Sequence, residues 1–159
     1  MGSVLKWNAK LKLTMPKALR SGHDEARAEL VRAMMEGGPI AIAARQVTQL
    51  CLPHFADEEK TVFPVLALLP YLEQGSLRPE MMDVMPLIVD FRAKRAALDD
   101  HHRSILAAID ALLRAAHKEK NREFAEFAHN LRVHEQIEEE VIYPTVILIG
   151  KYLREKLAG

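Results

Sequence analysis

An internal repeat constrains the fold of this chain more than any other feature. The stretches HFADEEKTVFP and HEQIEEEVIYP, which begin at His54 and His134, share a histidine, two glutamates and a proline at the same offsets. A second histidine lies 31 or 32 residues upstream of each stretch, since His23 precedes His54 and His102 precedes His134. The chain is therefore expected to contain two similar units.

The spacing of the apolar residues predicts that both units are helical. Apolar positions recur at intervals of three and four, with little β-branched alternation. The breaks GGP, GSLRP and HKEKN divide the pattern into helices near 18–36, 39–63, 86–116 and 121–142. Two such helical hairpins predict an all-α, antiparallel, up-down-up-down four-helix bundle. Short bent extensions are expected after Pro64 and Pro144, because proline removes a helical hydrogen bond.

The length of the chain favours one domain. Residues 1–159 are expected to form a single domain with its core bundle at about 18–145. An N-terminal arm at 1–17 and a C-terminal helical extension at 145–159 flank this core.

Charge and composition argue against several kinds of partner. Lysine plus arginine (22) balances aspartate plus glutamate (22), so no excess positive charge favours nucleic acid. The apolar runs are too short or broken to span a bilayer. The single cysteine, Cys51, fits a reducing compartment and is expected to be a small apolar residue in a helix. We therefore expect a cytoplasmic protein without nucleic-acid or membrane partners, and a protein partner is left open.

Every predicted helix places a histidine in its apolar stripe, and two helices add a glutamate. The four stripes are Leu19, His23, Ala26, Leu30; Val47, Leu50, His54, Glu58, Val62; Leu98, His102, Ile105, Ile109, Leu112; and Phe124, Phe127, Leu131, His134, Glu138, Val141. Burying a carboxylate without a partner is costly, and the apolar stripes themselves offer no lysine or arginine near these positions. Imidazole and carboxylate groups together suit a transition metal. The predicted metal ligands are His23, His54, Glu58, His102, His134 and Glu138.

Four histidines and two glutamates are more ligands than one ion would use, so they favour two ions. A tetrahedral zinc site takes four ligands and rarely combines four histidines with two carboxylates. Each half of the chain would supply two histidines, while Glu58 and Glu138 would bridge the ions. Coordination positions would remain open for water, hydroxide or a small ligand. Mixed imidazole and carboxylate ligation with open positions suits iron, with manganese or zinc as substitutes.

The remaining polar residues near the stripes are expected to play lesser roles. Glu59 and Glu139 lie one step off the stripes and are interpreted as solvated flanks. Asp99, one turn before His102, is a candidate to orient that imidazole, since metal-bound histidines need such a partner. The other histidines, His101, His117 and His129, are expected to be exposed or to lie next to the centre.

With these residues the chain resembles the hemerythrin-like, or HHE cation-binding, domains. Their motif is one histidine on the first helix and HxxxE on the second, repeated on the third and fourth helices. His23, His54 with Glu58, His102, and His134 with Glu138 match it, and the resemblance covers about residues 18–145. It implies a four-helix bundle holding two iron ions as a non-haem, oxo- or hydroxo-bridged centre.

The match is closer to one branch of this family than to another. Oxygen-carrying hemerythrins have HxxxH on the third helix and HxxxxD on the fourth, but position 106 is Leu and position 139 is Glu here. Four histidines with two glutamates resemble the bacterial stress-response and iron-centre repair branch. That branch usually has an additional cysteine-containing N-terminal domain, whereas this chain has a short arm.

The leading hypothesis from the sequence is a di-iron protein that binds or reacts with O2, NO or peroxide in stress response, sensing or iron handling. Catalytic turnover is left open. A ferritin-like oxidase would need ExxH on two helices, and only Glu126 with His129 has that spacing. The alternative is a metal-responsive interaction module, or a bundle whose polar core has no catalytic role. An exposed apolar patch at 146–152 would favour the module, and packing of that segment on the bundle would not.

Overall fold

The computed structural model describes residues 15–159, and these residues are helical and contain no strand. The predicted N-terminal arm therefore lies mostly outside the described residues. The elements in chain order are α2 (Lys17–Met35), α3 (Gly38–Thr61), α4 (Phe63–Leu66), α5 (Leu69–Glu73), the 3-10 helix η1 (Pro79–Val84), α6 (Met85–Lys118), α7 (Arg122–Ile137), the π-helical turn η2 (Glu138–Ile142) and α8 (Tyr143–Leu157).

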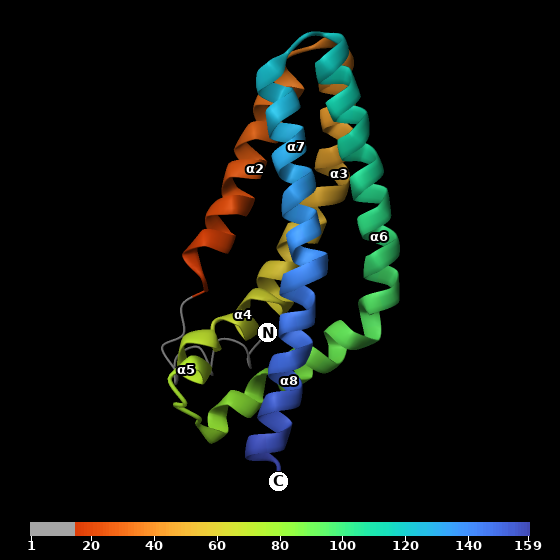
Figure 1. Cartoon of the computed structure of the whole chain (residues 1–159). Helices are drawn as coiled ribbons and strands as arrows, with labels where there is room; N and C mark the ends of the chain where they lie inside the picture. Colours follow the sequence, from red (N-terminus) through yellow and green to blue (C-terminus); the bar gives the residue numbers. More distant parts are fainter. Residues whose placement is uncertain (1–14) are drawn as a thin grey trace.

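Four long helices lie alongside one another, and α8 continues the line of α7 beyond them (Figure 1). Helix α2 packs against α3, α3 against α6, and α6 against α7. The α2–α3 and α6–α7 connections lie at the same end of the molecule (Figure 1). The all-helical prediction is confirmed, and α8, with 15 residues, covers most of the helical extension expected at 145–159.

Different residues make the tight connections of the two hairpins. Between α2 and α3, Gly37 and Gly38 have φ values of 87° and 56°, a region that costs glycine little. Between α6 and α7, Lys120 has a φ of 55°, and the Asn121 side chain then accepts a hydrogen bond from the Phe124 amide at 3.2 Å. Asn121 thus caps α7 at its first turn.

The two repeated prolines redirect the chain in different ways. Before Pro64, α3 ends at Thr61, and α4 begins at Phe63. Before Pro144, the helix instead widens into the π-helical turn η2 and then continues as α8. Proline lacks an amide hydrogen and its ring crowds the carbonyl four residues earlier, so both a break and a wider turn relieve the same conflict.

The core consists of two hydrophobic clusters with a polar layer between them. One cluster lies toward the hairpin connections and includes Leu30, Val47, Ile109 and Leu131. The other contains residues of α4, η1 and α8 and the first turns of α6. Along α3, α6 and α7, the predicted ligands fall between the residues of the two clusters. The fold therefore encloses the polar groups from both ends.

Helix α8 packs onto the rest of the molecule. Gly150 lies so close to α6 that a Cβ atom there would be 2.8 Å from Ile88 Cγ2. Within the segment 146–152, Val146 and Ile149 are buried, whereas Leu148 is 65% exposed. The packing interpretation of this segment is thus favoured over an exposed patch. None of the helices in residues 15–159 has the length and apolar character needed to cross a membrane.

Candidate metal centre

The six predicted ligands lie together in the polar layer. His23 is on α2, His54 and Glu58 are on α3, His102 is on α6, His134 is on α7, and Glu138 begins η2. Five of the six are buried, and the His134 side chain is 23% exposed. Their proximity agrees with the prediction, while their role as ligands stays a prediction.

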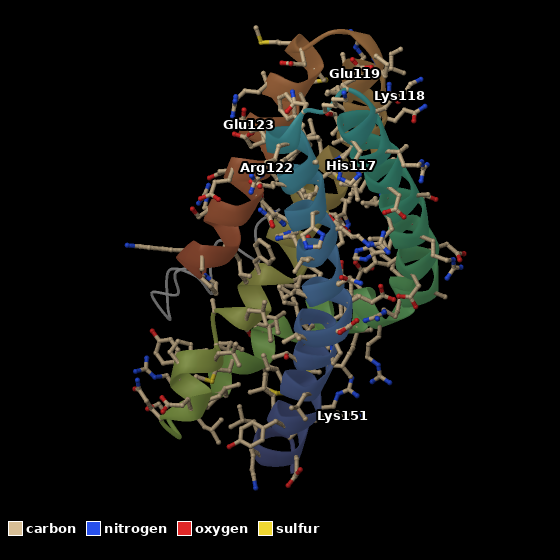
Figure 2. The ribbon with its side chains drawn as sticks, turned by 45° about the horizontal axis from the view of Figure 1, so that its top comes forward. His117, Lys118, Glu119, Arg122, Glu123 and Lys151 are labelled. Atoms are coloured by element: carbon tan, nitrogen blue, oxygen red, sulfur yellow. The ribbon has the colours of Figure 1, made fainter. Side chains whose placement is uncertain are left out.

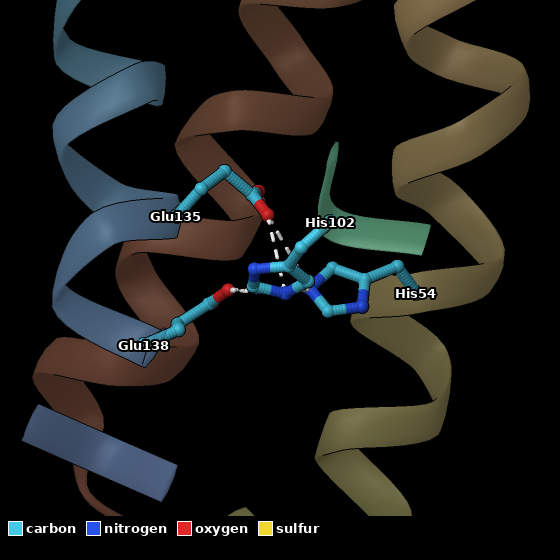
Figure 3. A group of neighbouring side chains, drawn as sticks. All are labelled: His54, His102, Glu135 and Glu138. Carbon is cyan, nitrogen blue, oxygen red and sulfur yellow. Dashed lines mark hydrogen bonds and ion pairs between the residues drawn. The ribbon is translucent and has the colours of Figure 1, made fainter. Parts of the chain in front are cut away.

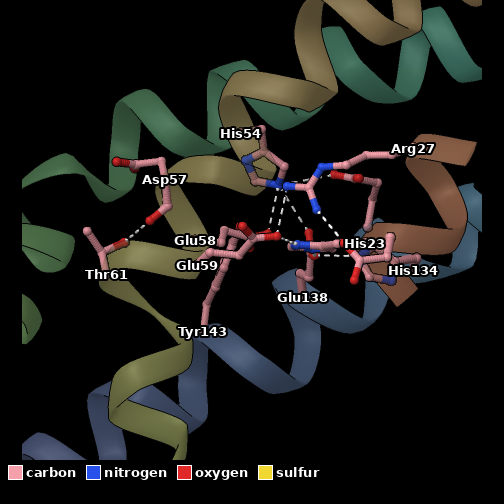
Figure 4. Close-up of polar contacts among 12 residues, drawn as sticks. His23, Arg27, His54, Asp57, Glu58, Glu59, Thr61, His134, Glu138 and Tyr143 are labelled. Carbon is pink, nitrogen blue, oxygen red and sulfur yellow. Dashed lines mark hydrogen bonds and ion pairs between the residues drawn. The ribbon is translucent and has the colours of Figure 1, made fainter. Parts of the chain in front are cut away.

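Glu138 occupies the middle of the layer and contacts all four histidines. Its Oε1 is 2.7 Å from His134 Nε2 and 3.3 Å from His23 Nε2. Its Oε2 is 3.2 Å from His54 Nε2 and 3.8 Å from His102 Nε2 (Figures 3 and 4). Each carboxylate oxygen thus faces a different pair of imidazoles, as a bridging ligand would.

Glu58 also lies between two histidines. Its Oε2 is 3.3 Å from His23 Nε2 and 3.4 Å from His54 Nε2, without hydrogen-bond geometry to either. Its Oε1 accepts a hydrogen bond from the Tyr143 hydroxyl at 2.7 Å. One oxygen of Glu58 is therefore held by tyrosine and the other faces the centre.

The donor atoms form two groups that share Glu138. One group contains His54, His102, Glu135 and Glu138, and the other contains His23, His134 and Glu138, each with its ligand atoms within 4.8 Å of one another. The histidines therefore pair across the two halves of the chain. This differs from the sequence-based expectation, in which each half supplies two histidines. Packing of α3 against α6 brings His54 Nε2 to 3.2 Å from His102 Nε2.

Glu135 belongs to the centre but is missing from the predicted ligands. It is buried, and its Oε2 lies 3.5 Å from His54 Nε2 and 3.6 Å from His102 Nε2 (Figure 3). Neither of its oxygens has a hydrogen-bond partner. Glu135 is thus a third carboxylate within reach of an ion.

The predicted stripe of the fourth helix is correct at Phe124, Leu131 and Glu138, whereas its other three positions are not fully buried. The buried positions are Phe124, Ala125, Ala128, Leu131, Glu135, Glu138 and Ile142. Val141, placed in the stripe by the sequence, is 57% exposed, and His134 lies at the edge of the buried face. Most of these positions also recur at intervals of three and four, so periodicity was compatible with them. It did not single out Glu135, because the adjacent His134 fitted the same intervals.

Tyr143 is a second residue that sequence reasoning missed. It is buried, and besides its hydrogen bond to Glu58 its hydroxyl oxygen lies 2.9 Å from His102 Nε2. The π-helical turn explains this position. Tyr143 follows Glu138 by five positions, a spacing that a wide turn returns to one face and an α-helix does not.

The outer nitrogens of two histidines face glutamates. His23 Nδ1 is 3.1 Å from Glu59 Oε1, which also accepts a hydrogen bond from Arg27 at 2.8 Å. His102 Nδ1 has no hydrogen-bond partner, and Glu139 Oε2 lies 4.0 Å away. Glu59 is therefore more than a solvated flank.

Asp99 does not orient His102, contrary to expectation. It accepts a hydrogen bond from Arg95 Nε at 2.8 Å, on the same face of α6. The Arg95 guanidinium in turn lies over the rings of Phe91 and Tyr143. Asp99 thus helps to position a cation beside the centre.

The other histidines lie apart from the donor groups. His101 is half-buried, with Nε2 3.3 Å from the Leu50 carbonyl oxygen. His117 and His129 are exposed and line a hollow of about 700 Å³ near the α6–α7 connection. Charged side chains such as Lys118 and Arg122 surround that connection (Figure 2).

Cys51 is buried, as expected, and burial raises the pKa of its thiol.

The two donor groups have different electrostatic environments. Burial lowers the pKa of His23, but the nearby carboxylates of Glu138 and Glu58 outweigh burial and raise it to about 9. Burial and the neighbouring His54 lower the pKa of His102 to about 4. Burial, together with Glu138 and Glu58, raises the pKa of Glu135 well above its usual range. His102, which stays neutral, therefore lies beside Glu135, whose ionised form is unfavourable.

Hydrogen bonds alone do not satisfy this arrangement. His54 Nε2 has four neighbours within 3.5 Å: Glu58 Oε2, His102 Nε2, Glu135 Oε2 and Glu138 Oε2. One imidazole nitrogen carries at most one hydrogen and makes one good hydrogen bond. A cation placed among these atoms would neutralise the charge of the carboxylates and accept lone pairs from the surrounding nitrogen and oxygen atoms.

Comparison with known proteins adds no relative. No protein-family model matches the chain, and no curated protein or solved structure gave a match. The donor set of this chain is therefore the basis for a functional assignment.

Proposed function

We propose that this chain is a non-haem di-iron protein of the hemerythrin-like type. Helices α2, α3, α6 and α7 would form a four-helix bundle, with one ion in each donor group. The position of Glu138 carries the proposal, because its two oxygens face different histidine pairs. Glu58 Oε2, between His23 and His54, would act as the second bridge.

A polar core without metal accounts poorly for the same residues. Both oxygens of Glu135, Oε2 of Glu58 and Nδ1 of His102 are buried without hydrogen bonds. An unsatisfied buried polar group costs about 1–3 kcal/mol, and a charged one costs more. Several such groups around one point favour a bound cation over an interaction module with a polar core.

The chemistry of the donors favours iron over the alternatives. Imidazole nitrogens suit iron, zinc and copper, whereas several carboxylates around open positions are typical of non-haem iron sites. Two ferrous ions, when bound, supply two electrons to peroxide or O2, or bind NO. The protein would hold the ions in fixed positions and keep bulk water away through the clusters at both ends of the polar layer.

A groove between α2 and α7 offers a route to the centre. It has a volume of about 420 Å³, and both Gly22 and His134 line it. His134 is the predicted ligand with the greatest exposure. A Cβ atom on Gly22 would lie 3.5 Å from His134 Cε1, so glycine keeps this end of the groove open.

Acidic residues surround this groove. Glu25, Glu29, Glu123 and Glu126 line it together with one arginine, Arg32. Arg32 is paired with both Glu29, at 2.8 Å, and Glu123, at 2.5 Å. A net negative entrance favours cations and neutral molecules over anions. Ferrous ions, O2, NO and hydrogen peroxide all meet that condition.

The test is a spectroscopic titration of iron-loaded protein. Protein reconstituted with ferrous iron under anaerobic conditions would be exposed separately to O2, hydrogen peroxide and NO. We expect a change in visible absorption with at least one of them, and none in metal-free protein. A protein that holds iron but shows no change with any of the three would contradict reactivity toward these ligands.

A further inference from the structure

The two repeats differ at two buried positions beside the centre. The second repeat follows the first at an offset of 80 residues, so that Glu135 corresponds to Phe55 and Tyr143 corresponds to Phe63. All four side chains are buried. One half of the centre thus carries two phenyl rings where the other carries a carboxyl and a phenol.

The side of the centre near His23 is aromatic and apolar. The His23 ring stacks on Phe55 at a centroid distance of 4.1 Å, and it lies 4.8 Å from the Phe63 ring. Neither phenyl ring offers a ligand atom. An ion on this side therefore takes its donors from histidine and the bridging glutamates alone.

The side near His102 has oxygen atoms at the equivalent places. Glu135 Oε2 is 3.6 Å from His102 Nε2, and the Tyr143 hydroxyl oxygen is 2.9 Å from the same nitrogen. The His102 and Tyr143 rings lie 5.4 Å apart, comparable to the distance between His23 and Phe63. Tyrosine thus occupies the position of a phenylalanine and adds one oxygen that points at the centre.

The tyrosine oxygen lies at the distance expected between two ligands of one ion. Metal–nitrogen and metal–oxygen bonds of about 2.0–2.2 Å at right angles place neighbouring donor atoms about 3 Å apart. The observed 2.9 Å between Tyr143 Oη and His102 Nε2 agrees, as does 3.2 Å between the Nε2 atoms of His54 and His102. The same 2.9 Å is a hydrogen-bond distance, so the hydroxyl is held between Glu58 and His102, where an ion would bind.

We infer that Tyr143 is a phenolate ligand of the iron ion nearest His102. This inference rests on the proposed function. When O2 oxidises the iron, the phenol oxygen of Tyr143 bonds to the ferric ion, and its proton passes through Glu58 Oε1, its present acceptor at 2.7 Å, to hydroxide formed from the reduced O2, so that Glu58 remains a carboxylate. The Arg95 guanidinium, 4.9 Å from the centre of the tyrosine ring, stabilises the resulting negative charge.

The two ion positions are then chemically different. Anionic oxygen ligands stabilise the ferric state, so the position beside His102 and Tyr143 would retain Fe(III) more strongly. The position beside His23 and His134 has fewer donors and lies nearer the α2–α7 groove. The geometry thus assigns exogenous ligand binding to the His23 side.

The test combines visible absorption, resonance Raman spectroscopy and iron analysis. A ferric phenolate gives a charge-transfer band in the visible region and enhanced vibrations of the phenol ring. Wild type, Tyr143→Phe and the control Tyr152→Phe would be loaded with ferrous iron and oxidised in air. Tyr143→Phe installs the ring that the other repeat already has, and circular dichroism would verify its fold.

Wild type and Tyr152→Phe are expected to show the phenolate signals, and Tyr143→Phe is expected to lose them while it still binds iron. Iron-containing wild type without phenolate vibrations, or a Tyr143→Phe variant that keeps them, would overturn the tyrosine assignment and leave the di-iron proposal intact. Failure of all three proteins to bind iron would overturn both.

Discussion

Glu135 is the residue whose burial is hardest to explain without a metal ion. It is fully enclosed, and both of its oxygens lack hydrogen bonds. Because burial raises its pKa, its contribution to stability is fully present below about pH 4.3 and is lost as pH rises through the raised value. At neutral pH the ionised Glu135 therefore destabilises the metal-free protein, and a bound cation would remove that destabilisation.

Glu135→Gln is expected to separate metal affinity from stability. The amide keeps the shape and removes the charge, so the metal-free variant should be more stable than wild type by about 1–3 kcal/mol at neutral pH. That gain should shrink toward pH 4, and iron affinity should fall. Urea unfolding and metal titration check both effects. The exposed Glu140→Gln is the control. A Glu135→Gln variant that lost stability as well as iron affinity would contradict this account.

His23 predicts a second pH dependence of the metal-free protein. Its pKa rises from 6.5 to about 9 on folding, so its favourable interaction with Glu58 and Glu138 is complete below pH 6.5. That contribution is lost as pH rises from 6.5 to about 9. The free energy of unfolding should therefore decline over this window in wild type and less steeply in His23→Gln. The same slope in both proteins would show that His23 is not the titrating group.

Among individual residues, the sequence predicted those that two independent patterns supported. His54 and Glu58 could be predicted because their offsets recur at His134 and Glu138 and because both lie on an apolar stripe. Glu135 has no polar counterpart in the other repeat. Its burial depends on which edge of the α7 stripe faces the core, a difference of less than the angle between neighbouring residues, which periodicity alone does not fix.

At the scale of elements, the π-helical turn determines which side chains α7 and α8 present to the centre. Helix boundaries were predicted within a few residues, because glycine and asparagine mark the hairpin connections. The π-helical turn was not predicted, since Pro144 is compatible with a bend, a break or a widened turn. The same proline motif gave a break in the first repeat and a π turn in the second.

Pro144→Ala is expected to let η2 tighten toward an α-helix and to move Tyr143 away from Glu138. Helical content should stay unchanged, whereas iron affinity should fall by about 10–100-fold, the usual effect of losing a group that orients ligands. Circular dichroism and metal titration measure the two quantities. Pro70→Ala, at the start of α5, is the matched control. Wild-type affinity in Pro144→Ala would mean that the π turn does not position the ligands.

Gly22→Leu is expected to narrow the groove between α2 and α7. A larger side chain would fill the space beside His134, so NO should bind the iron-loaded variant roughly tenfold more slowly, equivalent to about 1.4 kcal/mol of added barrier. Ala97→Leu is the control, because Ala97 lines the separate groove that reaches His54 between α3 and α6. Stopped-flow absorption gives the rates. Slowing by Ala97→Leu alone would assign entry to the α3–α6 side.

At the scale of the whole molecule, two hydrophobic clusters hold a polar layer in which several carboxylate oxygens and imidazole nitrogens have no hydrogen-bond partner. The helical class follows from periodicity alone, and the repeat predicts that the histidines and glutamates meet. Their pairing across the repeats could not be predicted, because it depends on how α3 packs against α6. Bound metal should stabilise the fold, by about 2.7 kcal/mol when free metal exceeds its dissociation constant a hundredfold.

The most direct test of the central claim is the iron content of the folded protein. Wild type and Glu138→Gln would be reconstituted with ferrous iron, freed of excess metal and subjected to elemental analysis. The proposed bridging role of Glu138 predicts two iron ions per chain in wild type and fewer in the variant. Folded wild-type protein that retains no iron, or a variant with undiminished content, would contradict a di-iron centre bridged by Glu138.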